Sequence, residues 1–320
     1  MKRGYAYIGK VNQITPIDGA ERVELATVLC GPGGVWRGVV PKGQYQEGDL
    51  CVTYLPDAIV PQTEELAFME RHKWRVSMRR FLGVPSEVLI MPNGIQGNVG
   101  DDATDALGVT KYEKPIPANM SGDIYGDFPS FIPKTDEPNF QSVPYLVEAM
   151  RGLRYVATLK ADGTSCTAYK YDDHFGVCSR NWELKPGNNV YWQVAEEYQI
   201  ANVLRDGWAV QFEVVGPGIQ GNPMKLDKLE PRLFNLYSIE DRRYSDHYAL
   251  RTLCSINGMP PVDVIQEGDN FNFTDDELLK LAEVSYRNKP GEGIVVRPLE
   301  ERSIEGERLS FKVINLLYKG

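Results

Sequence analysis

A proline-rich stretch divides this sequence into two parts with different patterns, and the division constrains the fold more than any other feature. Residues 109–140 show no regular hydrophobic period. They contain five prolines, Pro115, Pro117, Pro129, Pro133 and Pro138. Because proline cannot donate a backbone hydrogen bond, it interrupts helices and central strands. We therefore predict a linker at 109–140 between a first domain at 1–108 and a second at 141–320, and two domains suit a chain of 320 residues.

Short runs of alternating apolar and polar residues fill the first domain. Such runs lie at 23–28, 35–40 and 50–55, and the stretches 31–34 and 47–49 supply glycine-containing turns between them. Alternation with a period of two is typical of strands, and several short strands joined by tight turns are typical of a small closed barrel. The pattern predicts an OB-like β-barrel, with an SH3-like barrel as the alternative.

The densest basic cluster of the chain also lies in the first domain, with Trp74 and Phe81 interleaved. Its members, which we call the basic strip, are Arg71, Lys73, Arg75, Arg79 and Arg80. Cationic side chains can follow a phosphate backbone while an aromatic ring stacks on a base. We interpret the basic strip as a candidate nucleic-acid-binding surface. The alternative is a charged face that contacts only solvent.

The second domain alternates strand-like and helix-like segments. Residues 191–204 carry apolar side chains at helical spacing and stop at Asp206-Gly207. Thr274 and Glu277 have the spacing of a capping box, which predicts a helix from there through Val284. The whole chain is therefore predicted to be an α+β protein, a barrel followed by a mixed domain of antiparallel sheets and helices.

Charged residues interrupt four apolar strands of the second domain. They are Lys160 with Asp162 after the run 155–159, Glu213 within 208–215, Glu292 between two glycines before 294–297, and Lys312 within 309–315. In 208–215, alternation places Gln211 and Glu213 on the face opposite the apolar side chains. Because an unpaired charge is costly in apolar surroundings, we expect these residues to line one polar cleft. Taken singly, each is also compatible with an edge-strand charge.

The composition, 42% hydrophobic and 25% charged residues, is that of a globular protein. The five cysteines are widely spaced and form no CxxC pair, which argues against a zinc site and a disulfide framework. No apolar run approaches the roughly 18 residues that span a bilayer. We expect no membrane association and a reducing compartment, cytoplasmic or otherwise intracellular. Since the net charge is −9, nucleic-acid binding would require a local basic patch.

The charged positions belong to an ordered series of motifs. In chain order these are Lys160-Ala-Asp162-Gly163, Ser179-Arg180-Asn181, Phe212-Glu213-Val-Val-Gly216, residues 218–222, Leu233-Phe234-Asn-Leu-Tyr237, Glu292-Gly293 and Phe311-Lys312. In order and spacing they resemble the motifs of the covalent nucleotidyltransferases, and among these the ATP-dependent RNA ligases. The barrel and linker before them are similar to the subgroup with an N-terminal OB domain. The resemblance thus covers nearly the whole chain.

The resemblance implies an ATP-grasp-like ligase domain at 141–320 and a reaction in three steps. Lys160 would attack the α-phosphate of ATP and release pyrophosphate, and the AMP would then pass to an RNA 5′-phosphate. An RNA 3′-hydroxyl would finally displace the AMP and seal the strand. The function implied is RNA repair by a monomer, on RNA with 3′-hydroxyl and 5′-phosphate ends, including nicked duplexes.

The same resemblance assigns roles to the site residues. Lys160 and Lys312 would be catalytic, and neighbouring cations would favour the neutral amine of Lys160. The nucleotide contacts implied are these two lysines with Leu159, Asp162, Arg180, Glu213, Phe234, Tyr237 and Glu292. For stacking on the adenine, motif register favours Tyr237 over Phe234. Asp162, Glu213 and Glu292 would hold Mg²⁺ or Mn²⁺ through water, and the basic strip would contact RNA.

Two positions depart from the family pattern. Leu159 stands where many relatives have an acid. The polar contact that such an acid would make, to the adenine or to a water on the metal, therefore has no partner at this position. Ser310 stands where many have a first lysine, so Lys312 would act alone or with Lys319.

Two other classes of protein remain as alternatives. DNA ligases and capping enzymes share the Lys-x-Asp-Gly motif but resemble a core followed by a C-terminal OB domain, for which the residues after Lys312 leave no room. A non-catalytic RNA-binding OB protein would gain nothing from charged residues buried in the second domain.

Overall fold

The computed structural model describes residues 4–31, 34–82, 84–112, 123–286, 289–304 and 306–318. The chain divides into two compact units, which are described separately below. Unit 1 comprises Met1–Pro115 with Phe140–Tyr145, and unit 2 comprises Ile116–Asn139 with Leu146–Gly320.

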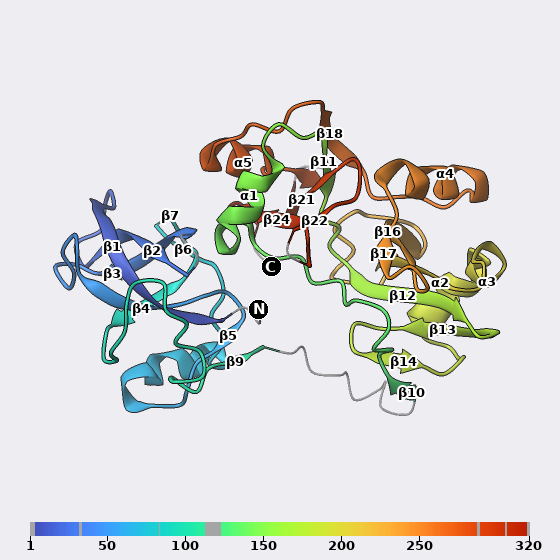
Figure 1. Cartoon of the computed structure of the whole chain (residues 1–320). Helices are drawn as coiled ribbons and strands as arrows, with labels where there is room; N and C mark the ends of the chain where they lie inside the picture. Colours follow the sequence, from blue (N-terminus) through green and yellow to red (C-terminus); the bar gives the residue numbers. More distant parts are fainter. Residues whose placement is uncertain are drawn as a thin grey trace. The chain divides into compact units, whose positions relative to one another are not determined.

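Unit 1 contains a curved five-stranded antiparallel sheet with the strand order β3-β2-β1-β4-β8. Its strands are β1 (Ala6–Pro16), β2 (Val23–Cys30), β3 (Gly34–Pro41), β4 (Leu50–Tyr54) and β8 (Leu89–Pro92). The N–H groups of Glu87 and Val88, just before β8, both donate to the carbonyl of Arg37 in β3, over 2.7 and 3.4 Å. The two edges of the sheet are therefore joined, and the sheet closes into a small barrel (Figure 1).

The barrel interior is filled by alternate side chains of its strands, as the sequence pattern predicts. In β3, Trp36 and Val40 are buried in the barrel core, whereas Val35 is exposed. A second apolar cluster lies outside the barrel, where the 3-10 helix η1 (Glu64–His72) buries Leu66 and Met69. The remaining strands are β5 (Ala58–Ile59), β6 (Arg79–Phe81), β7 (Val84–Ser86) and β9 (Thr110–Lys111). β6 pairs with β7, and β5 pairs with β9.

Unit 2 contains two larger antiparallel sheets. The seven-stranded sheet has the order β10-β14-β13-β12-β15-β16-β17, and the four-stranded sheet has the order β18-β11-β21-β24. The strands of the first are β10 (Ile124–Asp127), β12 (Thr164–Tyr171), β13 (His174–Cys178), β14 (Trp182–Leu184), β15 (Trp208–Val215), β16 (Glu230–Ser238) and β17 (Arg243–Tyr244). Those of the second are β11 (Tyr155–Leu159), β18 (Val264–Gly268), β21 (Gly293–Pro298) and β24 (Phe311–Ile314).

Short elements complete the unit. The hairpins are β19 (Ser285–Tyr286) with β20 (Lys289–Pro290), and β22 (Ser303–Ile304) with β23 (Glu307–Arg308). The helices are α2 (Val190–Glu197), α3 (Ile200–Val203), α4 (His247–Asn257) and α5 (Asp275–Leu281). Before them in the sequence lie η3 (Phe140–Ser142), which belongs to unit 1, and α1 (Pro144–Met150), which begins in unit 1 and continues in unit 2.

Helices α2, α3 and α4 cover one face of the seven-stranded sheet (Figure 1). Val210 and Phe212 of β15 lie in this core, fully buried. Gln211 and Glu213 therefore lie on the opposite face, as the alternation of β15 predicts. That opposite face is the one that reaches the four-stranded sheet, because Arg297 of β21 donates to the carbonyl of Phe234 in β16 over 2.7 Å.

The helix predictions are confirmed in part. Thr274 and Glu277 form both hydrogen bonds of a capping box at the start of α5, which ends at Leu281 rather than Val284. The single helix predicted over 191–204 is wrong, because it is divided into α2 and α3. Gln199 interrupts it with a left-handed backbone, φ +48°, which an α-helix does not accommodate.

Part of the predicted linker belongs to unit 2. Residues 113–122 lie outside the described residues, but β10 pairs with β14, and Ile132 is buried in the cluster that includes Tyr169. The prolines of this segment therefore do not prevent it from packing closely against the rest of unit 2. Within the described ranges, no helix is long and apolar enough to cross a membrane.

Candidate active site

Lys160 follows β11 directly and lies beside an acid from the neighbouring strand. Its N–H donates to the carbonyl of Gly293 in β21 over 2.9 Å. Its Nζ lies 2.5 Å from Oε1 of Glu292, and the two side chains are 26% and 23% exposed. The lysine and its partner are therefore half-buried, yet accessible to a ligand.

Two glycines allow the backbone to approach this pair closely. A Cβ at Gly163 would lie only 2.3 Å from the carbonyl oxygen of Val214 in β15. Gly293 adopts φ +139°, and a Cβ there would lie 2.1 Å from the carbonyl oxygen of Val313 in β24. Glycine is thus required at both positions, because any side chain would separate strands that carry site residues.

The backbone of Glu292 is fixed by a buried asparagine. Asn315 is fully buried, and its N–H donates to the carbonyl of Glu292 over 3.0 Å. Its side-chain amide donates to the carbonyl oxygens of Gly291, at 2.8 Å, and Val284, at 3.1 Å. Two of these hydrogen bonds hold the turn that presents Glu292, and the third connects the same asparagine to Val284.

Two tyrosines hold the segment that contains Asp162. The hydroxyl of Tyr318 donates to Oδ2 of Asp162 over 2.6 Å, and the hydroxyl of Tyr286 donates to the carbonyl of Lys160 over 3.1 Å. Burial raises the pKa of both tyrosines above the ordinary value, so both remain neutral donors. Sequence reasoning missed both tyrosines and the role of Asn315, because no local pattern marks a side chain that acts on a distant segment.

Glu213 and Asp162 act electrostatically on the same ammonium group. Burial lowers the pKa of Lys160, but the charges of Glu292 and the other two carboxylates outweigh this effect and raise it above the ordinary value. Burial, with the neighbouring acids Glu292 and Asp162, raises the pKa of Glu213 to about 8. The cluster therefore holds more carboxyl groups than one ammonium can stabilise in their charged form.

Lys312 and Arg180 approach this centre from other strands. Lys312 lies in β24 opposite Val295, which in turn lies opposite Thr158 of β11. Lys312 therefore shares a sheet face with Thr158 and Lys160. Arg180 lies in the turn between β13 and β14, where its Nη2 donates to Oδ1 of Asp136 over 2.6 Å. Its positive charge opposes part of the rise that burial causes in the pKa of Glu213.

The two candidate stacking rings occupy different surroundings. Phe234 is half-buried and packs against a cluster formed by Ala161, Val215 and Val262, next to Lys160. Tyr237 is only 6% exposed, in the separate cluster that contains Ile132, and its ring contacts Tyr244 edge-on. The structure thus brings Phe234, rather than Tyr237, beside the nucleophile segment, because neighbouring aromatic and aliphatic side chains already cover Tyr237.

Comparisons with known proteins decide the family. A family model described as RNA ligase matches residues 153–314, which is half of the chain, and a model described as an OB-fold domain matches residues 5–86. This chain belongs to the RNA ligase family. The OB-fold match also excludes the SH3-like alternative for the barrel.

Solved structures of an RNA ligase from Naegleria gruberi are similar to this RNA ligase over almost its whole length. A variant with ATP and Mn is 32% identical, with a TM-score of 0.81, over 98% of this chain and 96% of that chain. The same enzyme with pyrophosphate is 32% identical, with a TM-score of 0.80, over 98% and 97%. A variant with AMP and Mn is 32% identical, with a TM-score of 0.81, over 97% and 96%. No curated protein sequence matches this chain.

Two departures from the family pattern have structural explanations in this RNA ligase. Leu159 is buried on the sheet face opposite Lys160, and its N–H donates to the carbonyl of Asp263, so its side chain is directed away from the site. Ser310 is fully buried and accepts a hydrogen bond from Nε of Arg297. Lys319 lies outside the described residues.

The basic strip of the RNA ligase is only partly available for a ligand. Nη2 of Arg75 lies 2.6 Å from Oδ1 of Asp57, and its guanidinium lies over the ring of Tyr112. Arg71 and Arg79 are close enough that each lowers the pKa of His72, after the effect of burial. Of the predicted strip, Arg71 and Arg79 therefore form a cationic patch, Lys73 is exposed, and the charge of Arg75 is neutralised within unit 1. The side chain of Arg80 lies outside the described part of the chain.

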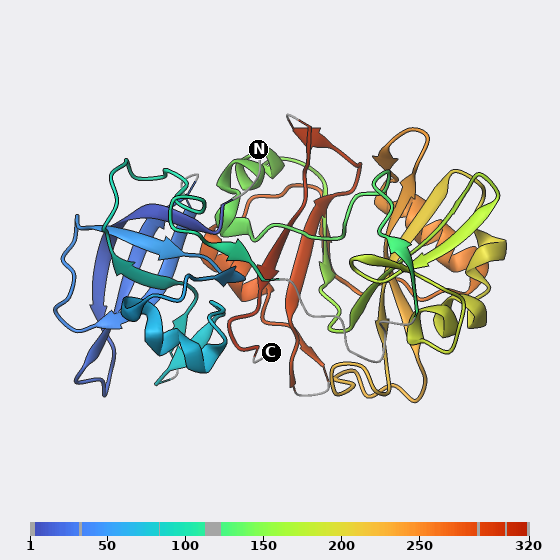
Figure 2. The same cartoon turned by 90° about the horizontal axis from the view of Figure 1, so that it is seen from below.

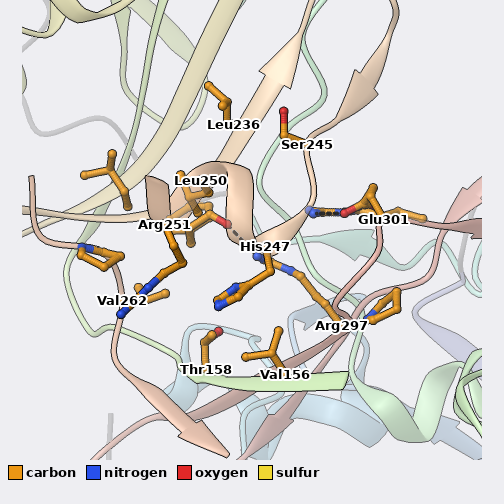
Figure 3. Close-up of a pocket in the computed structure, with 15 residues that line it drawn as sticks. Val156, Thr158, Leu236, Ser245, His247, Leu250, Arg251, Val262, Arg297 and Glu301 are labelled. Carbon is orange, nitrogen blue, oxygen red and sulfur yellow. Dashed lines mark hydrogen bonds and ion pairs between the residues drawn. The ribbon is translucent and has the colours of Figure 1, made fainter. Parts of the chain in front are cut away.

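A small pocket of unit 2 lies beside β11, the strand that leads into Lys160, and Val156 and Thr158 of that strand line it (Figure 3). Val156, Thr158, His247, Arg251 and Arg297 are among its lining residues. Its volume of about 20 Å³ has room for a single water molecule. The pocket is therefore too small to hold a nucleotide base.

Proposed function

We propose that this RNA ligase uses ATP and a divalent cation to join RNA 3′-hydroxyl and 5′-phosphate ends, with Lys160 as the nucleophile of the first step. The observation that carries the proposal is the half-buried pair of Lys160 and Glu292, with Glu213 and Asp162 acting on the same ammonium. The structures of the Naegleria gruberi enzyme with ATP, AMP, pyrophosphate and Mn support a nucleotide and a metal in this fold.

In the first step, Nζ of Lys160 would attack the α-phosphorus of ATP. The new bond joins nitrogen to phosphorus, and the bond from the α-phosphorus to the oxygen that bridges to the β-phosphate breaks, which releases pyrophosphate. Lys312 shares the sheet face of Lys160 and would neutralise charge on the α-phosphate. Arg180 would contact the outer phosphates or the RNA end.

The acids fit a divalent cation that is held mainly through water. Their negative charge exceeds what Lys160 offsets, as the raised pKa of Glu213 indicates. Among the described residues, however, no three acidic, histidine or cysteine side chains form a ready group of direct ligands. When bound, the cation supplies positive charge that opposes the effect of the carboxylates on the pKa of Lys160 and so favours the neutral amine.

We assign the adenine contact to Phe234 instead of Tyr237, because Phe234 packs beside Ala161. Phe234→Leu is expected to raise the half-saturating ATP concentration about tenfold, since one base–aromatic stack is worth roughly 1–3 kcal/mol. Tyr237→Leu is expected to lower the melting temperature and to leave the half-saturating ATP concentration within about twofold, because Tyr237 is a core residue. ATP titration of lysyl-adenylate formation distinguishes the two rings. The reverse result would return the stacking role to Tyr237.

We further propose that Arg71 and Arg79 attract RNA to unit 1. Reversing both charges to glutamate is expected to weaken RNA binding, and to reduce the log–log salt slope by about one unit for each RNA phosphate that the protein no longer neutralises. Arg22→Glu with Lys42→Glu is the matched control, because it makes the same charge change elsewhere on unit 1. A salt titration of RNA binding is the measurement. Equally weakened binding in both double variants would mean that only net charge matters.

The choice of RNA ends can be tested with nicked RNA duplexes. We expect sealing of a nick with a 3′-hydroxyl and a 5′-phosphate, and no sealing when the phosphate is on the 3′ side. The reason is that AMP activates a 5′-phosphate for attack by a hydroxyl. Sealing of the second nick would overturn the proposed end specificity.

We also propose that the enzyme acts as a monomer in a reducing compartment. All of its motif residues lie in one chain, and its five cysteines are buried and unpaired. Light scattering of the active enzyme should give the 36.0 kDa mass of one chain. A dimer mass would contradict the proposal.

A further inference from the structure

Residues 132–139, which we call the strap, connect the two sheets of unit 2 (Figures 1 and 2). Its residues contact one site segment after another. The carbonyl of Pro133 accepts a hydrogen bond from the side chain of Gln211, and Lys134 donates one to Asn181. The hydroxyls of Thr135 and Ser165 lie 2.8 Å apart, and the carboxylate of Asp136 accepts from Arg180. The carbonyl of Pro138 accepts from the N–H of Lys312. The strap therefore borders the site along its length.

Glu137 anchors the strap between two arginines. Its Oε1 lies 2.8 Å from Nη2 of Arg297 and 3.5 Å from Nη1 of Arg308. Glu301 completes the cluster, because its two carboxylate oxygens accept from Nε and Nη2 of Arg308, each over 2.8 Å. The cluster thus contains two positive and two negative side chains.

Burial makes this balance of charge important. The side chains of Glu137 and Glu301 are each 14% exposed, and Arg297 and Arg308 are 11% and 17% exposed. Burial alone would raise the pKa of Glu137, but the charges of Arg297 and Arg308 outweigh it and lower that pKa. Without Glu137, two guanidinium groups would share one acid in surroundings that penalise unpaired charge.

The anchor acts on β24 from two directions. Pro138, the next residue of the strap, accepts from the N–H of Lys312 over 2.7 Å, and Asn139 forms a parallel bridge with Lys312. In addition, Nε of Arg297 donates to Oγ of Ser310, two residues before Lys312. Among the described residues β24 is an edge strand of its sheet, so at Lys312 the strap bonds the side of β24 that faces away from β21.

We propose that Glu137 is a positioning residue that sets the place of Lys312 through the strap. The inference rests on the proposed catalytic role of Lys312, and it adds a residue that touches neither the nucleotide nor the metal. The strap bonds the backbone of Lys312 directly, so removal of its anchor would let β24 shift. A displacement of about 1 Å in a catalytic group costs on the order of 100-fold in rate.

Glu137→Gln and Glu301→Gln form a matched pair, because each removes one negative charge from the same cluster at equal exposure. We expect Glu137→Gln to slow single-turnover lysyl-adenylate formation at saturating ATP by about 10-fold to 100-fold. Glu301→Gln should change that rate by less than about threefold, since Glu301 lies outside the strap. Both variants should unfold at similar temperatures. If Glu137→Gln and Glu301→Gln slowed the reaction equally, the four charged residues would only stabilise the fold, and the proposal would be overturned.

Two further measurements separate the strap from the role of Lys312. Hydrogen exchange at the amide of Lys312 should become at least about tenfold faster in Glu137→Gln and stay unchanged in Glu301→Gln. In a Lys312→Ala background, Glu137→Gln should cause no additional decrease of rate, because it acts through Lys312. Unchanged exchange, or a full additional decrease, would overturn the proposal. A Lys312→Ala variant with wild-type rates would instead refute the proposed role of Lys312 itself.

Discussion

Lys160→Ala is expected to abolish covalent attachment of AMP to the protein. The alanine has no nucleophile, and Lys160 is the lysine whose Nζ lies 2.5 Å from the Glu292 carboxylate of the central cluster. We expect the rate of adenylylation to fall by at least about 10³-fold, the scale of the effect when a nucleophile is removed. Incubation with labelled ATP and a divalent metal, followed by denaturing electrophoresis, measures the attached label.

Lys185→Ala is the control for Lys160→Ala. Lys185 is an exposed lysine of unit 2 next to β14, so its removal should leave both labelling and the melting temperature unchanged. The assignment fails if the label persists in Lys160→Ala, or if it maps to Lys312.

Glu292→Ala should produce the next largest effect. Glu292 is the direct partner of Lys160 and one of the three acids proposed to hold the metal. Removing one preorganised electrostatic group from an active site costs roughly 10²-fold to 10³-fold. We therefore expect adenylylation to slow by about that factor at every metal concentration, measured as a single-turnover rate.

Glu300→Ala is the matched control for Glu292, because Glu300 is an exposed acid of unit 2 whose partner, Arg302, lies 3.6 Å away. Its removal should change the rate by less than about twofold. Near wild-type rates in Glu292→Ala would make Glu292 a structural edge charge.

Local patterns were sufficient to predict the centre of the site. Alternation in β15 placed Glu213 on the face opposite Phe212, and the apolar run 155–159 placed Lys160 and Asp162 directly after a strand. Both depend only on residues within one strand or turn. The short alternating runs of the first domain predicted its barrel for the same reason.

Contacts between distant segments could not be predicted in this way. Glu137 and Arg297 are 160 residues apart in the sequence, and Asp162 and Tyr318 are 156 apart. The prolines around Glu137 indicated a linker, although the segment packs along both sheets. The burial of Tyr237 and the pairing of Arg75 with Asp57 likewise depend on tertiary neighbours.

The central claim is that this RNA ligase carries AMP on Lys160. The most direct test is peptide mapping of the wild-type enzyme after incubation with labelled ATP and Mn²⁺, without RNA. We predict one adenylylated peptide, with the AMP on Lys160 in an acid-labile bond between phosphorus and nitrogen, and release of pyrophosphate in equal amount. AMP on another residue, or ATP turnover without any covalent adduct, would contradict the account.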